Sequence, residues 1–577
     1  MRIVTVRRLS QIFFLLVFLW FCITATLGAA WWQLRGWPIN WLLDLDPLTA
    51  LATVLATGTL YSSLTWALVA AVLTLFAGRF FCGFACPLGT LNQFTGWAGR
   101  RGLGLAERVE ANRHRRSQAL KYYLLVGLLA LALMGTVQTG IFDPLPLVHR
   151  SVNLALAPLA DNRLGLLSDE PRFYTSAWLL GVVFLGVIGL NLVLPRFFCR
   201  FLCPLGGLFG LLSRFAPWRI GKTSDKCGDC CICEEYCEGA CRPSGRFIGG
   251  ECVMCLNCLD RCPAGRVTFA TRASAAGEVA LPDLSRRGLI VAGGGLLLAS
   301  MWGVGGLAGP NRDANLIRPP GALDEERFLA RCLRCGQCMR ICPGNIIHPA
   351  LLEAGIQGLW SPVVNYRIGR SGCLPNCIAC GQVCPTAAIR PFSLEEKQGA
   401  GEFAAQGPIH MGTAFVDRGR CLPWAMDRPC LVCQELCPVS PKAIFVRTVF
   451  ETIRDGQALP AKAQGQGVVL ETAIPTAANL ASGDYYLRPT GEPEAALRRI
   501  TGLTGTSLTL ESPMAGKGLP AAGGRVDIVV RLSRPIVDAA KCTGCGMCEH
   551  ECPVSGQRAI RIYSENESRS RRGRLLI

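Results

Sequence analysis

The stretch CLRCGQCMRICP at residues 332–343 sets the framework for interpreting this chain. It follows the spacing C-x2-C-x2-C-x3-C-P, in which three close thiolates hold one [4Fe–4S] cube and the fourth cysteine reaches a second cube. Runs of this kind open at six positions, namely Cys227, Cys252, Cys332, Cys373, Cys421 and Cys542. Four runs keep this spacing, one begins C-x3-C, one begins C-x8-C, and five end on Cys-Pro. A zinc site is the alternative for any single run, but the recurrence indicates a multi-cluster iron–sulfur protein.

Pairing adjacent runs, so that each fourth cysteine crosses to the neighbouring cube, predicts six ligand sets. The sets are cluster 1 with Cys227, Cys230, Cys233 and Cys262; cluster 2 with Cys252, Cys255, Cys258 and Cys237; cluster 3 with Cys332, Cys335, Cys338 and Cys384; cluster 4 with Cys373, Cys377, Cys380 and Cys342; cluster 5 with Cys421, Cys430, Cys433 and Cys552; and cluster 6 with Cys542, Cys545, Cys548 and Cys437.

The first run leaves its fourth ligand open. Cys237 is followed by Glu238 rather than proline, whereas Cys241 precedes Arg242-Pro243. The recurrent x3 interval favours Cys237 over Cys241. Whichever is left over is expected to be an unligated thiol, as is Cys231.

Composition points to a membrane protein of several folding units. The chain has 577 residues, half of them apolar, and a formal charge of +18. Its basic residues crowd around the ends of apolar segments, so membrane topology explains them better than nucleic-acid binding. The 31 cysteines do not suit a disulfide framework, which belongs to short secreted domains.

Five stretches carry no charged residue over the roughly 20 residues that a spanning helix needs. They are Leu9–Leu34, Pro47–Gly78, Tyr122–Phe142, Phe173–Pro195 and Gly288–Asn311. The first has the basic start of a signal peptide, but its length and the spans that follow favour an anchor. The pattern predicts a four-helix membrane bundle with a fifth anchor.

The distribution of basic residues orients this bundle. The N-terminus holds three arginines and the loop from Arg79 to Lys121 holds eight basic residues, whereas the outer loops are poor in basic residues or offset by acidic ones. Both ends of the four-helix unit are therefore expected in the cytoplasm. The chain is then a multi-pass protein of the bacterial inner membrane, with the runs at Cys227 and Cys252 in the cytoplasm and the later four in the periplasm.

Ser285-Arg286-Arg287 precedes the fifth segment. It resembles a twin-arginine export signal, which suits a domain whose cubes are assembled before crossing. An ordinary basic flank on a spanning helix is the alternative. Cleavage near Ala308 is conceivable, but an uncleaved anchor is favoured.

The strongest internal repeat is RFFCGFACPLG at 79–89 and RFFCRFLCPLG at 196–206. If the local chain stays helical, cysteines four apart share one face, and Cys82, Cys86, Cys199 and Cys203 converge between the halves of the bundle. Three interpretations compete: a further metal or cluster site, redox-active thiol pairs, or small residues that only pack. The duplication favours a cofactor or redox role.

No haem is expected. The five histidines, which are His114, His149, His348, His410 and His550, all lie outside the apolar segments, and no C-x-x-C-H motif occurs. Iron–sulfur cubes are then the only evident one-electron carriers.

These features predict a multidomain fold. A four-helix membrane domain (1–215) precedes a cytoplasmic two-cluster ferredoxin-like α+β domain (216–284) and the fifth segment (285–311). A periplasmic four-cluster domain (312–449 and 535–577) encloses a β-rich insertion (450–534), where Val468–Ile474, Ser507–Glu511 and Val526–Leu532 are the expected strands.

Residues 1 to about 270 resemble the NapH-type membrane ferredoxins, on their four spans, two CxxxCP motifs and pair of cubane runs. Residues from Ser285 onward resemble the NapG and MauM ferredoxins, on the twin-arginine start, the four later runs and the segment MGTAFVDRGRCLPW. The chain thus resembles a fusion of the two subunits of a quinol dehydrogenase module.

The resemblance implies that menaquinol or ubiquinol from the membrane pool is oxidised and that electrons pass to a periplasmic reductase or electron-carrier protein. Two other functions remain open: a redox maturation or assembly factor for a periplasmic enzyme, and a conduit from a cytoplasmic donor to the periplasm. The sequence identifies no quinone pocket; residues near Arg79 and Arg196 are candidates.

Overall fold

A computed structural model describes residues 3–30, 38–165, 171–224, 230–279, 284–295, 315–464, 467–474, 480, 482–513 and 524–569. The chain forms two compact units. The first comprises Met1–Arg370 with Asn376–Ile409, and the second comprises Ser371–Pro375 with His410–Ile577. Each is described by itself below.

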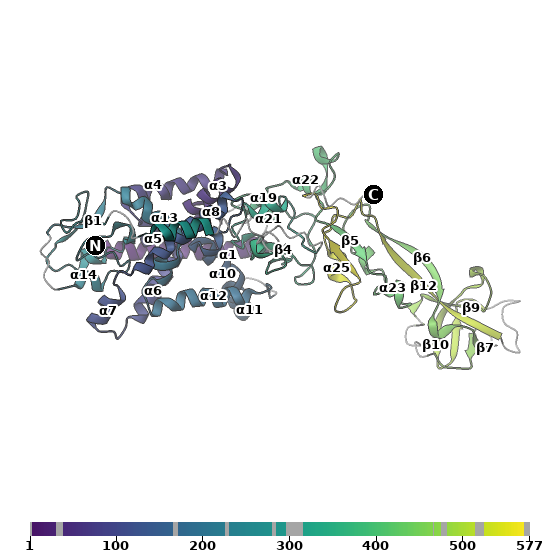
Figure 1. Cartoon of the computed structure of the whole chain (residues 1–577). Coiled ribbons are helices and arrows are strands. Elements are labelled where there is room, and N and C mark those ends of the chain that lie inside the picture. Colours follow the sequence, from purple (N-terminus) through teal and green to yellow (C-terminus); the bar gives the residue numbers. More distant parts are fainter. Residues whose placement is uncertain are drawn as a thin grey trace. The chain divides into compact units, whose positions relative to one another are not determined.

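Helix α1 (Ile3–Ala30) runs through the first unit. Near its start, the Arg7 guanidinium donates to Asn257 Oδ1 (3.3 Å) in α15 (Asn257–Arg261). Near its end, Thr26 Oγ1 accepts from Arg340 Nε (2.8 Å) in α20 (Gln337–Arg340). Helix α1 therefore contacts one cysteine-rich module at each end, and Figure 1 shows the regions of α14 (Ile232–Glu235) and α21 (Ala379–Gln382) on opposite sides of the helices.

Among the described residues, one helix is long and apolar enough to cross a membrane by itself, over Ile3–Gly28. Shorter apolar helical stretches cover Pro47–Thr57, Ser62–Ala77 and Ala177–Leu192. Helix α8 (Leu120–Leu133) has 14 residues. The expected fifth segment lies largely outside the described residues. The predicted membrane bundle with four full spans therefore stays a prediction.

The expected span Pro47–Gly78 is divided. Helix α3 (Pro47–Thr57) ends at Gly58, whose φ of 68° is in the left-handed region that favours glycine. A 3-10 turn (Ser62–Trp66) then leads into α4 (Ala67–Ala77). Both α3 and α4 are apolar, so hydropathy does not distinguish them. The turn at Gly58 is what separates the two helices.

A second duplication, not noticed in the sequence, explains this division. Asp46-Pro47-Leu48 begins α3 and Asp143-Pro144-Leu145 begins α10 (Pro144–Ser151). Each aspartate caps its helix, accepting from the backbone N–H of Leu48 (2.9 Å) or Leu145 (3.2 Å), and each is fully buried. Proline at the first helical position is pre-set for this start. The two short helices are thus equivalent elements of the two halves.

The chain on both sides of each aspartate reaches the same cysteine-rich module. Asn40 and Ser63 flank α3 and donate to the carbonyls of Val383 (2.5 Å) and Pro385 (2.7 Å). Around the second aspartate, Val137 and Arg150 bond to the carbonyls of residues 329 and 334, respectively. The segments that carry the two aspartates therefore both begin and end at this module.

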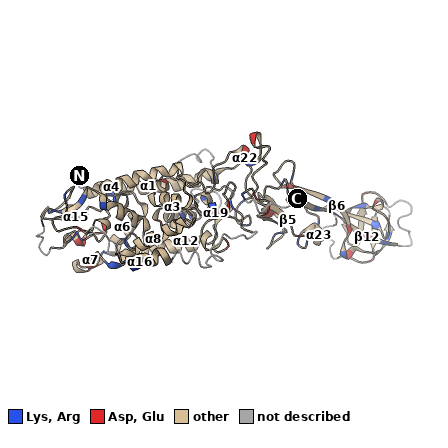
Figure 2. Ribbon diagram, turned by 45° about the horizontal axis from the view of Figure 1, so that its top comes forward, with Lys and Arg blue, Asp and Glu red and all other residues tan. Residues whose placement is uncertain are grey.

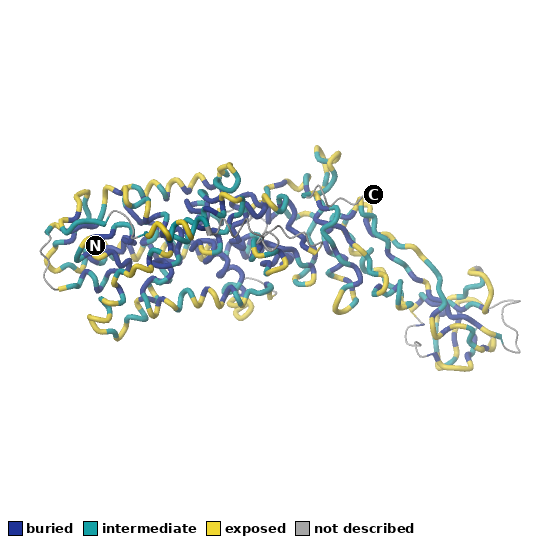
Figure 3. Tube along the Cα trace, viewed as in Figure 1, coloured by how far each residue is buried: buried dark blue, intermediate teal, exposed yellow. Residues whose placement is uncertain are grey.

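The surfaces of the outer helices are apolar. The exposed large side chains on α4 and on α12 (Ala177–Gly189) include Leu68, Val72, Phe76, Trp178 and Leu185. Neither helix contains a charged residue, and Figure 3 shows exposed positions along them, whereas Figure 2 shows their ribbons without charge. A belt of this kind suits contact with lipid or protein rather than water.

Each cysteine-rich module of the first unit is built on a two-stranded antiparallel sheet. Strand β1 (Arg219–Lys222) pairs with β2 (Val267–Ala270), and β3 (Ile347–Pro349) pairs with β4 (Pro362–Val364). A short helix begins one residue before the third cysteine of each triplet, namely α14 and α15 in one module and α20 and α21 in the other. This α+β pattern matches the ferredoxin-like expectation.

The second unit joins a cysteine-rich module to the β-rich region. Strand β5 (Thr413–Val416) pairs with β13 (Ile560–Tyr563), beside α24 (Val432–Glu435) and α25 (Met547–Glu551). A long antiparallel ribbon of β6 (Ile444–Thr452) and β12 (Gly524–Val537) leads away from this module, as Figure 1 shows.

The insertion is a small closed barrel. Beyond the ribbon, the sheet continues through β7 (Leu459–Gln464), β8 (Gly467–Leu470), β11 (Ser507–Leu510), β10 (Arg498–Thr504) and β9 (Tyr485–Pro489), and β9 pairs back onto β12. Closure removes exposed strand edges. Its own core includes Leu487, Ile500 and Val530, so the predicted β-rich region is present.

Candidate iron–sulfur sites and the paired cysteine motifs

The four cysteines predicted for cluster 6 line one cavity in the second unit. The cavity measures about 290 Å³ and is bordered by Cys437, Cys542, Cys545 and Cys548. Ala443 and Ile444 at the base of the ribbon close it on one side. Four thiols around one largely apolar space are the donor set that a [4Fe–4S] cube requires.

The first unit has a similar arrangement for cluster 3. A cavity of about 360 Å³ is lined by Cys332, Cys335, Cys338 and Cys384. The cysteines that come from the triplet and the distant Cys384 therefore meet around one space, as the crossing of the fourth ligand requires.

Cysteines predicted for cluster 5 also come together. Cys421 and Cys433 each interact electrostatically with Cys430 and with Cys552, although Cys552 is more than a hundred residues away.

For cluster 4, Cys342, Cys377 and Cys380 lie in the first unit and Cys373 lies in the second. Cys373 donates its backbone N–H to the Cys545 carbonyl (2.7 Å), which places it beside cluster 6.

In the first module, Cys237 interacts electrostatically with Cys255 and Cys258 of the second run. The Sγ atoms of Cys237 and Cys241 are 3.4 Å apart, and Cys241 also interacts with Cys252. Cys237 and Cys241, the two candidates for the fourth cysteine of the first run, therefore both lie beside the triplet Cys252, Cys255 and Cys258. Cys227 of cluster 1 lies outside the described residues, so that set stays a prediction.

The protein supplies these thiols in surroundings that suit a metal cluster. Burial raises the pKa of the Cys335, Cys433 and Cys545 thiols to about 12. A thiolate at such a site needs bound metal to compensate its charge. No disulfide joins the cysteines in the described part of the chain. In the same part of the chain, no three His, Cys, Asp or Glu side chains lie close enough together to hold a single metal ion. A cube holds its thiolates farther apart than a single ion does.

The paired CxxxCP motifs do not form continuous helices. Helix α5 (Phe80–Phe84) and a π-helical turn (Phe198–Leu202) each end before the second cysteine of the motif. Cys86 and Cys203 then cap α6 (Pro87–Gly99) and α13 (Pro204–Leu212), with Sγ accepting from the N–H of Gly89 (3.4 Å) and Gly206 (3.2 Å). The helical face expected from the spacing is absent because proline disfavours helix at the residue before it.

The four thiols nevertheless converge. Cys82 interacts electrostatically with Cys86, Cys199 and Cys203. Asn92 donates to Cys199 Sγ (3.3 Å). Cys86, Cys199 and Cys203 are buried, and Cys82 is half-buried. The duplication thus brings two pairs of thiols to one place.

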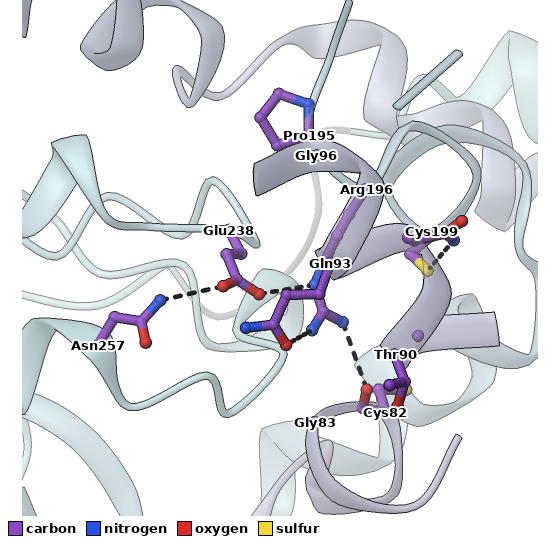
Figure 4. Close-up of polar contacts among 12 residues, drawn as sticks. Cys82, Gly83, Thr90, Gln93, Gly96, Pro195, Arg196, Cys199, Glu238 and Asn257 are labelled. Atoms are coloured by element: carbon purple, nitrogen blue, oxygen red, sulfur yellow. Dashed lines mark hydrogen bonds and ion pairs between the residues drawn. The ribbon is translucent and has the colours of Figure 1, made fainter. Parts of the chain in front are cut away.

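Two buried arginines connect this site to the module that contains strands β1 and β2 and the cysteines predicted for cluster 2, called the cluster 2 module below. Arg196 reaches the Cys82 carbonyl (3.3 Å), Gln93 Oε1 (3.2 Å) and Glu238 Oε2 (2.8 Å), as Figure 4 shows. Arg79 donates to the Gly250 carbonyl (3.1 Å) and interacts with Cys82 and Cys203. Both guanidinium groups therefore place positive charge beside the thiols, which offsets part of the cost that burial imposes on a thiolate.

Glu238 explains the departure from Cys-Pro after Cys237. Burial alone would raise the pKa of Glu238, but Arg196 and Arg7 lower it below its ordinary range. The carboxylate also accepts from Asn257 Nδ2 (3.1 Å). A charged residue stands where the other runs have proline because it anchors this loop to the CxxxCP site.

The site lies between the modules at the two ends of α1. Cys203 interacts electrostatically with Asp143, at the start of α10. Arg150, at the end of α10, interacts with Cys332 and Cys335 of cluster 3. A helix of eight residues spans about 12 Å, so α10 connects the surroundings of the CxxxCP thiols with those of cluster 3.

Sequence analysis did not assign a structural role to several buried charged residues. They are Arg7, Asp46, Lys121, Asp143 and Glu251. The repeated Asp-Pro-Leu would have indicated the two aspartates. Lys121 and Glu251 form a buried ion pair, and neither flanking sequence indicates this pairing.

Comparison with known proteins agrees with these sites. Residues 59–106 and 176–223 match a family model described as a 4Fe-4S binding domain, and residues 535–555 match another model with that description. The first two segments contain the CxxxCP motifs. No solved structure matches the chain.

Several relatives are ferredoxin-type proteins. The methylamine utilization ferredoxin-type protein MauM of Methylophilus methylotrophus is 31% identical over 188 residues, covering 31% of this chain and 75% of MauM. The ferredoxin-type protein NapH of Escherichia coli is 29% identical over 292 residues, covering 47% and 90%. The uncharacterized protein MJ0749 of Methanocaldococcus jannaschii is 30% identical over 203 residues, covering 35% and 69%. This chain belongs to the family of ferredoxin-type [4Fe–4S] proteins.

Proposed function

We propose that this protein is a membrane-bound electron carrier of the bacterial inner membrane. It takes electrons from quinol and delivers them, through the six [4Fe–4S] clusters predicted above, to a periplasmic reductase or electron-carrier protein. In this proposal the chain joins the functions of a NapH-type and a NapG/MauM-type subunit.

The observation that carries the proposal is the position of the modules along α1. The helix has 28 residues, or about 42 Å at 1.5 Å per residue, and a bilayer core is about 30 Å thick. The contacts at Arg7 and Thr26 hold a cysteine-rich module at each end. If α1 crosses the membrane, the two modules face opposite sides of it.

The CxxxCP thiols are proposed to hold a further cluster. They lie between cluster 2 and cluster 3, and the segments that carry them match a 4Fe-4S binding domain. Arg79 and Arg196 would compensate the charge of the thiolates, and Asn92 would hydrogen-bond one of them. A bound cluster here would supply a one-electron carrier in the interior of the helical region.

The test is a count of iron and acid-labile sulfide in full-length protein purified anaerobically in detergent, followed by a redox titration. Six cubes give about 24 iron atoms and a seventh gives about 28. A quinol analogue should reduce the clusters at rates compatible with turnover. Slow or absent reduction, together with an enzyme lacking its cofactor in a deletion strain, would instead indicate a maturation factor. Potentials of clusters 1 and 2 well below those of quinones would indicate a cytoplasmic donor.

The location of the modules is tested separately. Fusion of an alkaline phosphatase reporter after residue 569 should give activity, because that enzyme requires the periplasm, and fusion after residue 279 should not. Activity in the opposite pattern, or in neither fusion, would refute the proposed orientation.

A further inference from the structure

An open cleft of about 970 Å³ lies in the first unit, where the helices meet the cluster 2 module. It is lined by Arg79 and Tyr122, by most of residues 210–220, and by Phe247–Cys252 with Met254. Of the predicted cluster ligands in the described part of the chain, only Cys252 is among its lining residues.

The inner end of the cleft is polar and firmly held. Glu251 is only 2% exposed, and its carboxylate accepts from Gln118 Nε2 (3.2 Å), Tyr122 Oη (3.2 Å) and Lys121 Nζ. Arg79 is 1% exposed, and its Nε and one of its terminal nitrogens have no hydrogen-bond partner in the protein. A ligand at this end would therefore lie beside a fixed carboxylate and a buried guanidinium.

The outer end is apolar and faces away from the protein. Leu211 and Trp218 line the cleft, and beside them stand Phe76 and Phe215, 58% and 69% exposed. The backbone N–H of Trp218 donates to the Phe76 carbonyl (3.3 Å), which connects the rim to the end of the apolar helix α4. Exposed aromatic side chains at the end of such a helix suit the boundary between lipid and water. A ligand can therefore enter from the hydrocarbon phase.

The cleft also reaches the redox centres. Cys252, a predicted ligand of cluster 2, lines it directly. Arg79 faces both the cleft and the thiols Cys82 and Cys203. A molecule in the cleft would thus lie beside the predicted cluster 2. Only the Arg79 side chain would separate it from the CxxxCP thiols.

We propose that this cleft binds a membrane quinol, with the ring among Tyr122, Phe247 and Trp218, one hydroxyl at Glu251 and Arg79, and the isoprenoid tail over the apolar rim. A flat aromatic ring with a hydroxyl at each end and an apolar tail matches the lining, and no purely polar ligand would use the rim. The inference rests on the proposed function and assigns its substrate site.

Oxidation of one bound quinol breaks two O–H bonds. A [4Fe–4S] cluster held by Cys252 and the other cysteines predicted for cluster 2 would supply an acceptor that takes the quinol's two electrons one at a time. Its two protons leave to water at the open side of the cleft, where Glu278 and Arg219 form an ion pair of 2.6 Å. The products are quinone and reduced clusters.

The first test is binding, measured without turnover. Full-length protein in detergent is irradiated with azido-ubiquinone and, in a parallel sample, with an azido-naphthoquinone as a menaquinone analogue. We expect labelled peptides from residues 210–220 and 247–254, and the analogue that labels identifies the quinone class. Labelling confined to other regions, or of neither segment by either probe, overturns the assignment.

A matched pair of glycine variants tests the cavity itself. A Cβ at Gly249, in the wall of the cleft, would meet nothing nearer than 3.7 Å, and a Cβ at Gly245 in the same loop would meet nothing within 4 Å. Both positions therefore accept a side chain. Gly249→Leu should lower labelling and quinol-dependent cluster reduction at least about tenfold, whereas Gly245→Leu should leave both unchanged. Reduction by dithionite should be the same in all three proteins.

A second pair removes one exposed tryptophan at a time. Trp218→Ala should weaken labelling several-fold, whereas Trp97→Ala, at a tryptophan that is 47% exposed and not part of the cleft, should not. If quinol still reduces the clusters but neither Gly249→Leu nor Trp218→Ala has an effect, the site assignment fails and the proposed function stands. If the probes label the cleft but no quinol reduces the clusters, the cleft binds quinone and the proposed function fails.

Discussion

The buried ion pair between Arg196 and Glu238 gives the sharpest test of how the CxxxCP site is held. Their atoms Nε and Oε2 are 2.8 Å apart, and Arg7 lies 3.9 Å from the same oxygen. All three side chains are at most 4% exposed. Glu238→Gln keeps the size of the side chain but leaves two buried guanidinium groups without their carboxylate.

The expected cost follows from this burial. Removing one partner of a buried ion pair destabilises a protein by about 3–5 kcal/mol, because the remaining charge is desolvated and unpaired. For a unit of several hundred residues, this corresponds to a fall of about 3–10 °C in the unfolding midpoint. The ion pair between Arg113 and Glu110 supplies the control, since its side chains are 64% and 60% exposed. Glu110→Gln should cost less than about 1 kcal/mol.

The assay is thermal unfolding of the full-length protein in detergent, followed by tryptophan fluorescence and by loss of the visible absorbance of the clusters. Glu238→Gln should lower both midpoints, and Glu110→Gln should lower neither by more than about 1 °C. Replacing the pair together, as Arg196→Met with Glu238→Met, should cost less than the sum of the single changes. Equal midpoints for Glu238→Gln and Glu110→Gln would refute the assignment of this pair as a structural anchor.

Three further predictions concern the cluster sites. Cys82→Ser and Cys199→Ser should each lower the iron content by about four atoms per chain. Cys231→Ser, at a cysteine outside every predicted set, should leave the iron content unchanged. Unchanged iron content in all three variants would exclude a cluster at the CxxxCP site. Cys542→Ser should likewise remove about four iron atoms, and retention of full iron content would contradict the predicted cluster 6. Replacing residues 454–527 by a two-residue turn should leave the iron content intact, because the barrel has its own core; loss of iron would show that the barrel supports the clusters.

The cysteine triplets could be predicted from sequence because their ligands are local. Three thiolates within seven residues can wrap one face of a cube whatever the rest of the fold does. A distant fourth cysteine was expected beside each triplet, and the structure brings Cys384 and Cys437 to the expected triplets. The β-rich insertion was equally accessible, since β-branched runs bounded by turns are a local signal.

The arrangement inside the helical region was not predictable in the same way. Hydropathy gave Pro47–Gly78 as one span, although it contains two helices of 11 residues each, α3 and α4, with a turn between them. A hydropathy window averages over about 19 residues, so it does not register a reversal at a single glycine. The helical spacing of Cys82 and Cys86 was likewise misleading, because the proline after Cys86 ends the helix.

By itself, the sequence determined what chemistry the chain carries, because the spacing of thiolates is a property of neighbouring residues. Only the tertiary structure decided where that chemistry lies. It placed Glu238 on Arg196, Glu251 beside a cleft, and the CxxxCP thiols between two cysteine-rich modules. Each of these contacts joins residues far apart in the chain, and such pairs form only when the buried surfaces that hold them have packed.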